Sequence, residues 1–430
     1  MKSEISIGLL GLGTVGSGVA KILQQHQKDL RHKLGVPVLI KKVLIKDEGK
    51  DRQIALNPDI FTTDIGGILN DPSLDIIVEV MGGIDGAKQA IEKALRAGKQ
   101  VVTANKDVMA EHGHELLKLA DQEKCDLFYE ASVAGGIPII RTLEDGLASD
   151  RISSLMGIVN GTTNYILTKM KKENMSYETA LEKATELGFA EADPSSDVDG
   201  LDAARKMVIL SSLAFSTEVH LDDVLVRGMS EIQDGDLELA DQFGYTVKMV
   251  GTSKKDEEGI EVTVEPIFLA NSHPLAAVNN EFNAVYIYGD AVGETMLYGP
   301  GAGSLPTATS VVSDIIAACR NLLLGVNGKR LHAAQYERVM KEDRYCHAKY
   351  FHRLLVKDEL GVLSKLTSIY SQHQASLQSV MQHPIKSEGK AEIILLTHHI
   401  SRQQHVDIMS DLEGIASVIS HYRIEGEESV

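Results

Sequence analysis

The sequence has 430 residues, which at about 150 residues per domain predicts roughly three domains. Hydrophobic residues make up 43% and charged residues 24% of it, which excludes a disordered or fibrous chain. The 43 Lys and Arg against 61 Asp and Glu give a net charge of −18, so neither nucleic acid nor an anionic membrane is expected as a partner. There is no run of 18 apolar residues and no CxxC spacing, and we expect a soluble cytoplasmic protein.

The first third of the chain alternates short apolar runs with helical patterns. Strands are predicted at 5–10, 38–45, 75–80, 99–103 and 126–130, and helices at 87–97 and 111–123. This alternation predicts an α/β fold with a Rossmann-type, doubly wound parallel sheet, whose ligands bind at the carboxyl ends of the strands.

A glycine-rich turn follows the first predicted strand and opens the first predicted helix. In that context the pattern GxGxxG predicts a dinucleotide site. Gly11 permits the tight turn, Gly13 lets a pyrophosphate reach the N–H groups at the helix start, and Gly16 lets helix and strand pack closely. The predicted cofactor contacts are Gly11, Leu12, Gly13, Thr14, Val15 and Gly16.

The end of the second strand bears on coenzyme choice. Asp47 would pair there with the ribose hydroxyl of NAD(H). However, Lys46, Lys50 and Arg52 surround this aspartate and favour the 2′-phosphate of NADP(H). We therefore expect NADP(H) with NAD(H) left open, and a solvated charged loop is the alternative interpretation.

The sequence pattern changes after residue 138 and again near residue 348. We expect a Rossmann domain at 1–135, completed by part of 305–345, because an apolar helix of small residues at 308–324 suits a return to the first sheet. A substrate-binding and dimerisation domain of α+β type is expected at 136–304. Residues 348–430 form strands and helices in the order βαββαβ, which predicts a small appended α+β module.

Two groups of charged residues are candidates for chemistry. Lys106 follows a strand end, where its ammonium would bridge cofactor and substrate; the alternative is a solvated lysine. In the acidic segment 188–206, Asp199 is the expected N-cap of a helix that carries Asp202 and Lys206 on one face. This arrangement is either a surface ion pair or a set of carboxylates that grips a substrate ammonium. In the second case the neighbouring carboxylates keep Lys206 protonated, and it donates that proton to an alkoxide formed when a hydride arrives.

Six segments, in their order and spacing, resemble the homoserine dehydrogenase family: GLGTVG, TANK, YEASVAGGIPII, GIVNGTTNYIL, ELGFAEADPSSDVDGLDAARK and GPGAG. The resemblance covers nearly the whole chain, and the fourth and fifth segments are specific to that family. It implies NAD(P)-dependent interconversion of L-aspartate 4-semialdehyde and L-homoserine, on the route to threonine and methionine. A single-function enzyme is expected, because no kinase-like region precedes the glycine-rich turn.

The resemblance also implies roles for individual residues. By position, Lys206 is the proton donor, and the substrate contacts are Glu191, Asp197 and Asp202. Further cofactor or active-site contacts are Lys46, Thr103, Lys106, Gly188 and Gly303. At position 46 the family's NADP-preferring members commonly have arginine instead. A monovalent cation, Na⁺ or K⁺, would be bound by Glu130 and the main-chain carbonyls of Val133, Gly135 and Ile137. The alternative is that this turn merely joins two domains.

The carboxyl-terminal module resembles an ACT domain, a small amino-acid-binding fold whose strands commonly pair between subunits. Gly361 would be its turn residue, with backbone N–H groups free for a ligand carboxylate. The resemblance predicts L-threonine as effector and a homo-oligomer, dimer or tetramer; a purely dimerising role is the alternative. A non-catalytic NAD(P)-responsive sensor is the rival function. It is disfavoured because Lys106, Glu191, Asp202 and Lys206 occur together and a sensor needs no proton donor.

Overall fold

The computed structural model describes residues 2–47, 56–190, 193–329, 336–385 and 389–427. Its contacts divide the chain into two compact units, each built from three segments. Unit 1 comprises Met1–Ile152, Arg205–Asp223 and Phe282–Arg338. Unit 2 comprises Ser153–Ala204, Val224–Glu281 and Val339–Val430.

Unit 1 contains a parallel sheet of six strands. These are β1 (Ile5–Leu10), β2 (Val38–Leu44), β3 (Phe61–Thr62), β4 (Ile76–Glu79), β5 (Gln100–Thr103) and β6 (Leu127–Phe128). Their order is β3-β2-β1-β4-β5-β6, which is the doubly wound order of dinucleotide-binding folds. Every residue of β1 is buried, as expected for an apolar strand covered on both faces. The predicted Rossmann-type sheet is confirmed.

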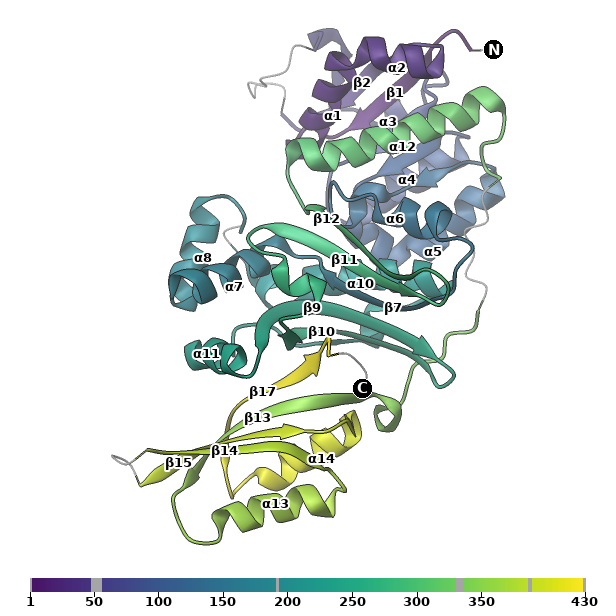
Figure 1. Ribbon diagram of the computed structural model, residues 1–430. Helices are drawn as coiled ribbons and strands as arrows, with labels where there is room; N and C mark the ends of the chain where they lie inside the picture. Colours follow the sequence, from purple (N-terminus) through teal and green to yellow (C-terminus); the bar gives the residue numbers. More distant parts are fainter. Residues whose placement is uncertain (1, 48–55, 191–192, 330–335, 386–388, 428–430) are drawn as a thin grey trace. The chain divides into compact units, whose positions relative to one another are not determined.

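Helices of unit 1 complete this sheet (Figure 1). They are α1 (Thr14–Gln25), α2 (Gln27–Leu34), α3 (Ile65–Leu69), α4 (Asp85–Arg96), α5 (Lys106–Glu123), α6 (Ile139–Arg141) and α12 (Ser304–Leu324), with short turns η1 (Pro58–Ile60), η2 (Glu130–Ser132), η3 (Thr142–Gly146) and η4 (Leu221–Asp223). The strands β11 (Phe282–Gly289) and β12 (Gly293–Pro300) form an antiparallel hairpin in the same unit. Helix α10 (Leu201–Phe215) begins in unit 2 and continues into unit 1.

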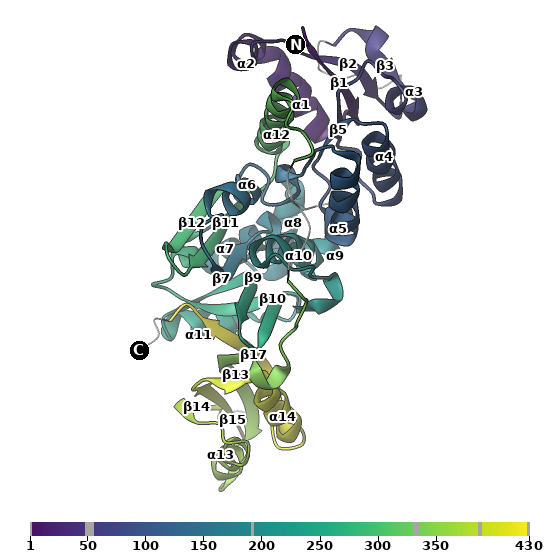
Figure 2. The ribbon, with the colours of Figure 1, turned by 90° about the vertical axis from the view of Figure 1, so that its right-hand side faces the viewer.

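Helix α12 returns to the first sheet from far along the chain and lies beside α1 (Figures 1 and 2). The approach is close because Gly18 has no side chain: a Cβ there would be 2.5 Å from the carbonyl oxygen of Ser304. Among the described helices α12 alone is long and apolar enough to cross a membrane by length and composition. Its residues Val311, Ile315 and Ala318 belong instead to the hydrophobic core beneath the sheet.

Unit 2 is built on a second, mixed sheet with the order β7-β9-β10-β17-β13-β15-β14, to which β8 and β16 add at β10 and β13. Its strands are β7 (Ile152–Ile158), β8 (Val224–Val226), β9 (Tyr245–Asp256), β10 (Gly259–Ala270), β13 (His347–Lys357), β14 (Leu377–Ile385), β15 (Lys390–Thr397), β16 (Ile400–Ser401) and β17 (Ser417–Glu425). Its helices are α7 (Gly161–Glu173), α8 (Tyr177–Glu186), α9 (Ser195–Val198), α11 (Asp234–Gln242), α13 (Val362–Gln372) and α14 (Arg402–Leu412), with turns η5 (Pro274–Ala277) and η6 (Asp343–Tyr345).

The last part of unit 2 has the predicted βαββαβ order with one addition, the two-residue strand β16 before α14, and α13 and α14 pack on its strands (Figure 2). It is joined to the rest of the unit through β17, which pairs in parallel with β10 and antiparallel with β13. The ring of Phe268 on β10 stacks 4.4 Å from Tyr422 and lies 4.5 Å from Phe351. The module therefore shares a core with the preceding sheet.

Several element boundaries differ from the sequence prediction. Helix α5 begins at Lys106, because the side chain of Asn105 accepts a hydrogen bond from the Val108 N–H at 3.2 Å and caps the helix. Asp199 was expected to cap α10, but it ends α9 instead. Gly200, with φ +84°, takes the cap position and accepts from the Ala204 N–H at 2.9 Å.

Candidate active site

The glycine-rich turn joins β1 to α1 at the carboxyl edge of the parallel sheet. Gly11 has φ +105°, and a Cβ there would be 2.8 Å from the Val80 carbonyl oxygen. A Cβ at Gly16 would be 2.2 Å from the Gly11 carbonyl oxygen, so both positions require glycine. Gly13 is the N-cap of α1 and faces open space, which leaves the first N–H groups of the helix accessible to a phosphate.

At the end of β2, Lys46 and Asp47 are both exposed, as a contact with the cofactor's ribose would require. Lys50 and Arg52, which were part of the same prediction, lie outside the described residues. Gly303, another predicted cofactor contact, is exposed at the N-cap of α12 with φ +117°.

A hydrogen-bonded cluster rigidifies the turn that leads to Lys106. Glu79 is fully buried at the end of β4, and burial raises the pKa of its carboxyl. It accepts from the Thr103 hydroxyl at 2.6 Å, and that hydroxyl accepts from the Asn105 N–H at 3.0 Å. Thr103, a predicted cofactor contact, is fully buried, and its hydroxyl is already engaged by Glu79 and the Asn105 N–H. Glu79 was not predicted as a site residue, although an acidic residue inside an otherwise apolar strand indicates a buried polar group.

Lys106 and Lys206 are both half-buried, and an ion pair connects the residues beside them. The Arg205 Nε lies 3.3 Å from the Asp107 Oδ1, so the beginning of α5 is tied to α10 within unit 1. The Arg205 side chain is 21% exposed and that of Asp107 is 32% exposed, which limits solvent screening of this pair. This ion pair therefore brings the start of α5, which carries Lys106, next to the part of α10 that carries Lys206.

The predicted carboxylates of unit 2 meet at Asn160, the residue before α7. Its Nδ2 donates to Asp197 at 2.7 Å and to Asp202 at 2.8 Å. Asp202 and Asn160 are each 5% exposed, and Asp197 is half-buried. Asp202 lies one helical turn before Lys206 on α10. Sequence analysis missed Asn160, because nothing local in GIVNGTTNYIL shows which carboxylates its side chain reaches.

The segment before these carboxylates is also held by α7. The Thr162 hydroxyl donates to the Phe189 carbonyl at 2.8 Å, next to Gly188, which is exposed with φ +76° just after α8. Glu191, predicted as a substrate contact, lies outside the described residues.

The turn predicted to bind a cation contains one buried acid, Glu130, and a second buried acid, Asp314 of α12, packs against it. The Glu130 N–H donates to Asp314 at 2.8 Å, and Arg141 forms an ion pair with Asp314 at 2.8 Å. Burial raises the pKa of Glu130, and burial followed by the nearby charge of Glu130 raises the pKa of Asp314 to about 8. Such a pair of like charges is an environment that a bound cation would stabilise.

The carbonyl groups of the same turn are shaped by unusual backbone angles. Ala134 and Gly135 have φ +54° and +51°, and a Cβ at Gly135 would be 2.3 Å from the Gly301 carbonyl oxygen. The Gly135 carbonyl accepts from the Ser310 hydroxyl at 2.7 Å, and that of Ile137 accepts from the Ile139 N–H at 2.8 Å. Across the described residues no group of three His, Cys, Asp or Glu side chains could hold a metal.

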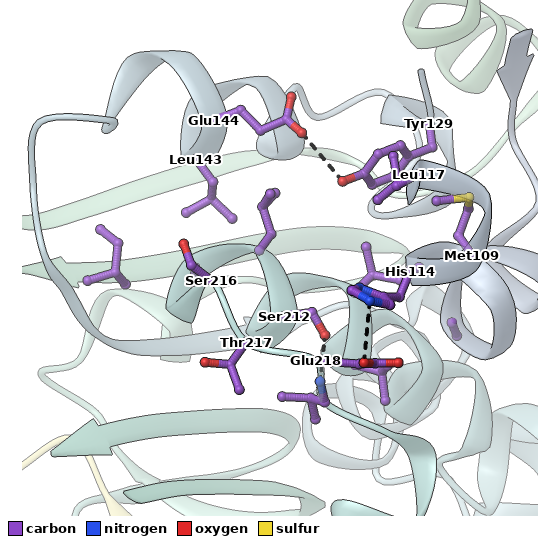
Figure 3. Close-up of a pocket in the computed structure, with 18 of the residues that line it drawn as sticks. Met109, His114, Leu117, Tyr129, Leu143, Glu144, Ser212, Ser216, Thr217 and Glu218 are labelled. Carbon is purple, nitrogen blue, oxygen red and sulfur yellow. Dashed lines mark hydrogen bonds and ion pairs between the residues drawn. The ribbon is translucent and has the colours of Figure 1, made fainter. Parts of the chain in front are cut away.

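A cavity of about 550 Å³ lies further along α5 and α10 (Figure 3). His114 faces Glu218 across it at 3.6 Å, and the Tyr129 hydroxyl donates to Glu144 at 3.4 Å. Its lining includes none of the predicted site residues that the structure describes. It is therefore separate from the residues expected to carry the chemistry.

The sheet order and glycine-rich turn place the protein in the class of Rossmann-type, NAD(P)-binding oxidoreductases. Two family models match it: "Homoserine dehydrogenase, NAD binding domain" over residues 11–130 and "Homoserine dehydrogenase" over residues 138–316. The homoserine dehydrogenase of Bacillus subtilis (strain 168) is 55% identical over 426 residues, covering 98% of each chain. The chain belongs to the homoserine dehydrogenase family.

Solved structures agree with this assignment. A homoserine dehydrogenase from Thiobacillus denitrificans has a TM-score of 0.90 at 34% identity and covers 98% of both chains. A hyperthermophilic archaeal homoserine dehydrogenase in complex with NADPH has a TM-score of 0.63 at 28% identity, covering 73% of this chain and 97% of its own. The protein is an NAD(P)-dependent oxidoreductase that interconverts L-aspartate 4-semialdehyde and L-homoserine.

Proposed function

We propose that α10 supplies both the proton and part of the substrate site for this reaction. The proposal rests on the position of Asp202, which precedes Lys206 by one turn of the same helix. The Asn160 side chain links Asp202 to Asp197 by donating a hydrogen bond to each. The carboxylates bind the substrate's ammonium group, and Lys206 gives its proton to the aldehyde oxygen as that oxygen becomes an alkoxide. NAD(P)H, when bound, supplies the hydride. Lys106, held near α10 by the Asp107–Arg205 pair, orients the reacting group.

The experiment that tests the proposal is a turnover assay. Purified protein is mixed with L-aspartate 4-semialdehyde and either NADPH or NADH, and the absorbance of the reduced coenzyme is followed. We expect oxidation of the coenzyme that depends on the semialdehyde, and loss of it in Lys206→Ala.

We propose that NADP(H) is preferred, although NAD(H) is also used. The support is the exposed Lys46 beside Asp47 at the end of β2, where a cation pairs with a 2′-phosphate. The archaeal relative that was solved with NADPH agrees with this choice.

We further propose that Na⁺ or K⁺ binds at the turn, with Glu130 and the carbonyls of Val133, Gly135 and Ile137 as ligands. The buried pair of Glu130 and Asp314 supports this, because a nearby cation lowers the free energy of the ionised pair. The carboxylate and carbonyl oxygens are hard ligands that suit such an ion.

We propose that the chain has three functional parts: the Rossmann domain at 1–135 with part of 305–345, the substrate and dimerisation domain at 136–304, and an ACT-like module at 348–430. The ACT-like module binds L-threonine as an effector near Gly361. Gly361 is exposed with φ +87° immediately before α13, and a carboxylate effector bound there would meet the N-terminal end of this helix. An assembly of two or four copies would bury the exposed apolar face of the β11–β12 hairpin, which contains Tyr288, Val292, Met296 and Tyr298.

A cytoplasmic location is supported by the three cysteines, which are buried and unpaired.

A further inference from the structure

Asn160 joins two carboxylates that come from different helices. Asp197 is on α9 and Asp202 is on α10, and each accepts one hydrogen from the same side-chain NH₂ group, at 2.7 and 2.8 Å. Because both acceptor oxygens lie within hydrogen-bond distance of one nitrogen, the two acids are close neighbours. Two ionised carboxylates so near each other repel, and an amide that donates to both offsets that repulsion.

The position of Asn160 is itself fixed by α7. Its Oδ1 accepts from the Thr163 N–H at 2.9 Å, so Asn160 is the N-cap of this helix. One turn later the Asn164 side chain accepts from Lys248 at 3.0 Å and donates to the Asn280 carbonyl at 2.9 Å. Since the amide oxygen is committed to the cap, the NH₂ group is directed at the two acids. The positive end of the α7 dipole acts in the same direction, because it favours negative charge at the helix start.

A substrate of this enzyme class carries an ammonium group beside its carboxylate. Such a group binds best to acids that are both ionised and held at a fixed separation, since it must replace its water shell with their oxygens. The segment GIVNGTTNYIL therefore reaches the substrate indirectly, through the acids that its N-cap residue, Asn160, holds in place.

We propose that Asn160 is a positioning residue that sets the separation and orientation of Asp197 and Asp202 for recognition of the substrate's ammonium group. The inference rests on the proposed function of these two acids. Asn160 acts through them, and the amino group of the substrate is the part of the ligand that depends on it.

The test separates this role from helix capping. In Asn160→Ser the hydroxyl still caps α7, but the two donors to the acids are lost. The assay compares kcat/KM for L-homoserine with that for 4-hydroxybutanoate, which lacks only the amino group, or the inhibition constant of the latter if it turns over too slowly. We expect the preference for homoserine to fall about 10-fold or more in the variant, because hydrogen bonds to charged groups are the strong ones. KM for NADP⁺ should stay unchanged.

Ser176→Ala is the matched control, since Ser176 caps the neighbouring helix α8 through the Thr179 N–H at 3.3 Å. It should leave the preference for homoserine unchanged. Equal losses of kcat/KM on both ligands in Asn160→Ser would overturn the proposal. If the serine variant does not fold, Asn160→Thr keeps the cap, fills more space and is judged by the same ratio. An unchanged preference for homoserine in Asp202→Asn would instead reject the proposed function of the acids.

Discussion

Replacing the buried Lys248 should change how the stability of unit 2 depends on pH. Lys248 is 2% exposed, and its ammonium donates to Asn164 and to the Val278 carbonyl. Burial, together with the charges of Lys172 and Lys171, lowers the pKa from 10.5 to about 7. We consider the variant Lys248→Met, which is similar in length and cannot be charged.

Because folding lowers the pKa of Lys248, a rise in pH should make the folded protein more stable relative to the unfolded chain. In the unfolded chain the lysine binds a proton up to about pH 10.5, whereas in the folded protein it releases that proton above about pH 7. Folding is therefore penalised by roughly 5 kcal/mol below pH 7, and the penalty falls by about 1.4 kcal/mol per pH unit until it vanishes near pH 10.5. Between pH 7 and 9 the wild type should gain about 2 kcal/mol from this group, and Lys248→Met should gain none of it.

The free energy of unfolding at pH 7 alone is a weaker test than its change with pH. The methionine removes the charge penalty, but it leaves the Asn164 oxygen and the Val278 carbonyl without a donor, at a cost of about 1–3 kcal/mol each. Urea unfolding is followed by circular dichroism at pH 7, 8 and 9, because the chain has no tryptophan. Lys365→Met, which changes an exposed lysine of the same unit, is the control. Identical pH slopes for wild type and Lys248→Met would refute the reasoning.

The remaining predictions concern catalysis and regulation. Lys206→Ala should lower turnover by about 10²–10⁴ while the protein stays folded by circular dichroism, and near-normal turnover would remove its assigned role. Lys46→Ala should raise KM for NADPH more than for NADH, and equal changes in steady-state assays would exclude a phosphate contact. Replacing Na⁺ and K⁺ by tetramethylammonium should slow the wild type but not Glu130→Gln, whereas equal rates in all salts would argue against the cation. L-Threonine at millimolar concentration should inhibit the full chain and not Gly361→Asp, whose carboxylate would repel the effector; inhibition of neither or of both would assign the module another role. Removing the module is a poorer test, because it would strip β17 from β10 and expose Phe268.

Local sequence determined the nucleotide-binding part of this protein. The alternation of apolar runs with helical patterns predicted the parallel sheet, and Gly11 and Gly16 stand where a side chain would overlap the backbone. These features were predictable because they depend on periodicity and on the backbone angles of single residues. The return of a distant helix to the first sheet was also predictable, since an apolar helix of small residues needs a close partner.

Only the tertiary structure decided which polar groups meet. Asn160 contacts acids 37 and 42 residues away, and Glu130 donates its N–H to an acid 184 residues away. The pairing of Asp107 with Arg205 and the low pKa of Lys248 likewise depend on which elements pack together. The type of a side chain determines how many hydrogen bonds it can donate and accept. Its partners and its burial depend on packing between segments far apart in the chain. For this reason the sequence could name Asp197, Asp202 and Lys206 as candidates, while the residue that organises the two acids appeared only in the folded chain.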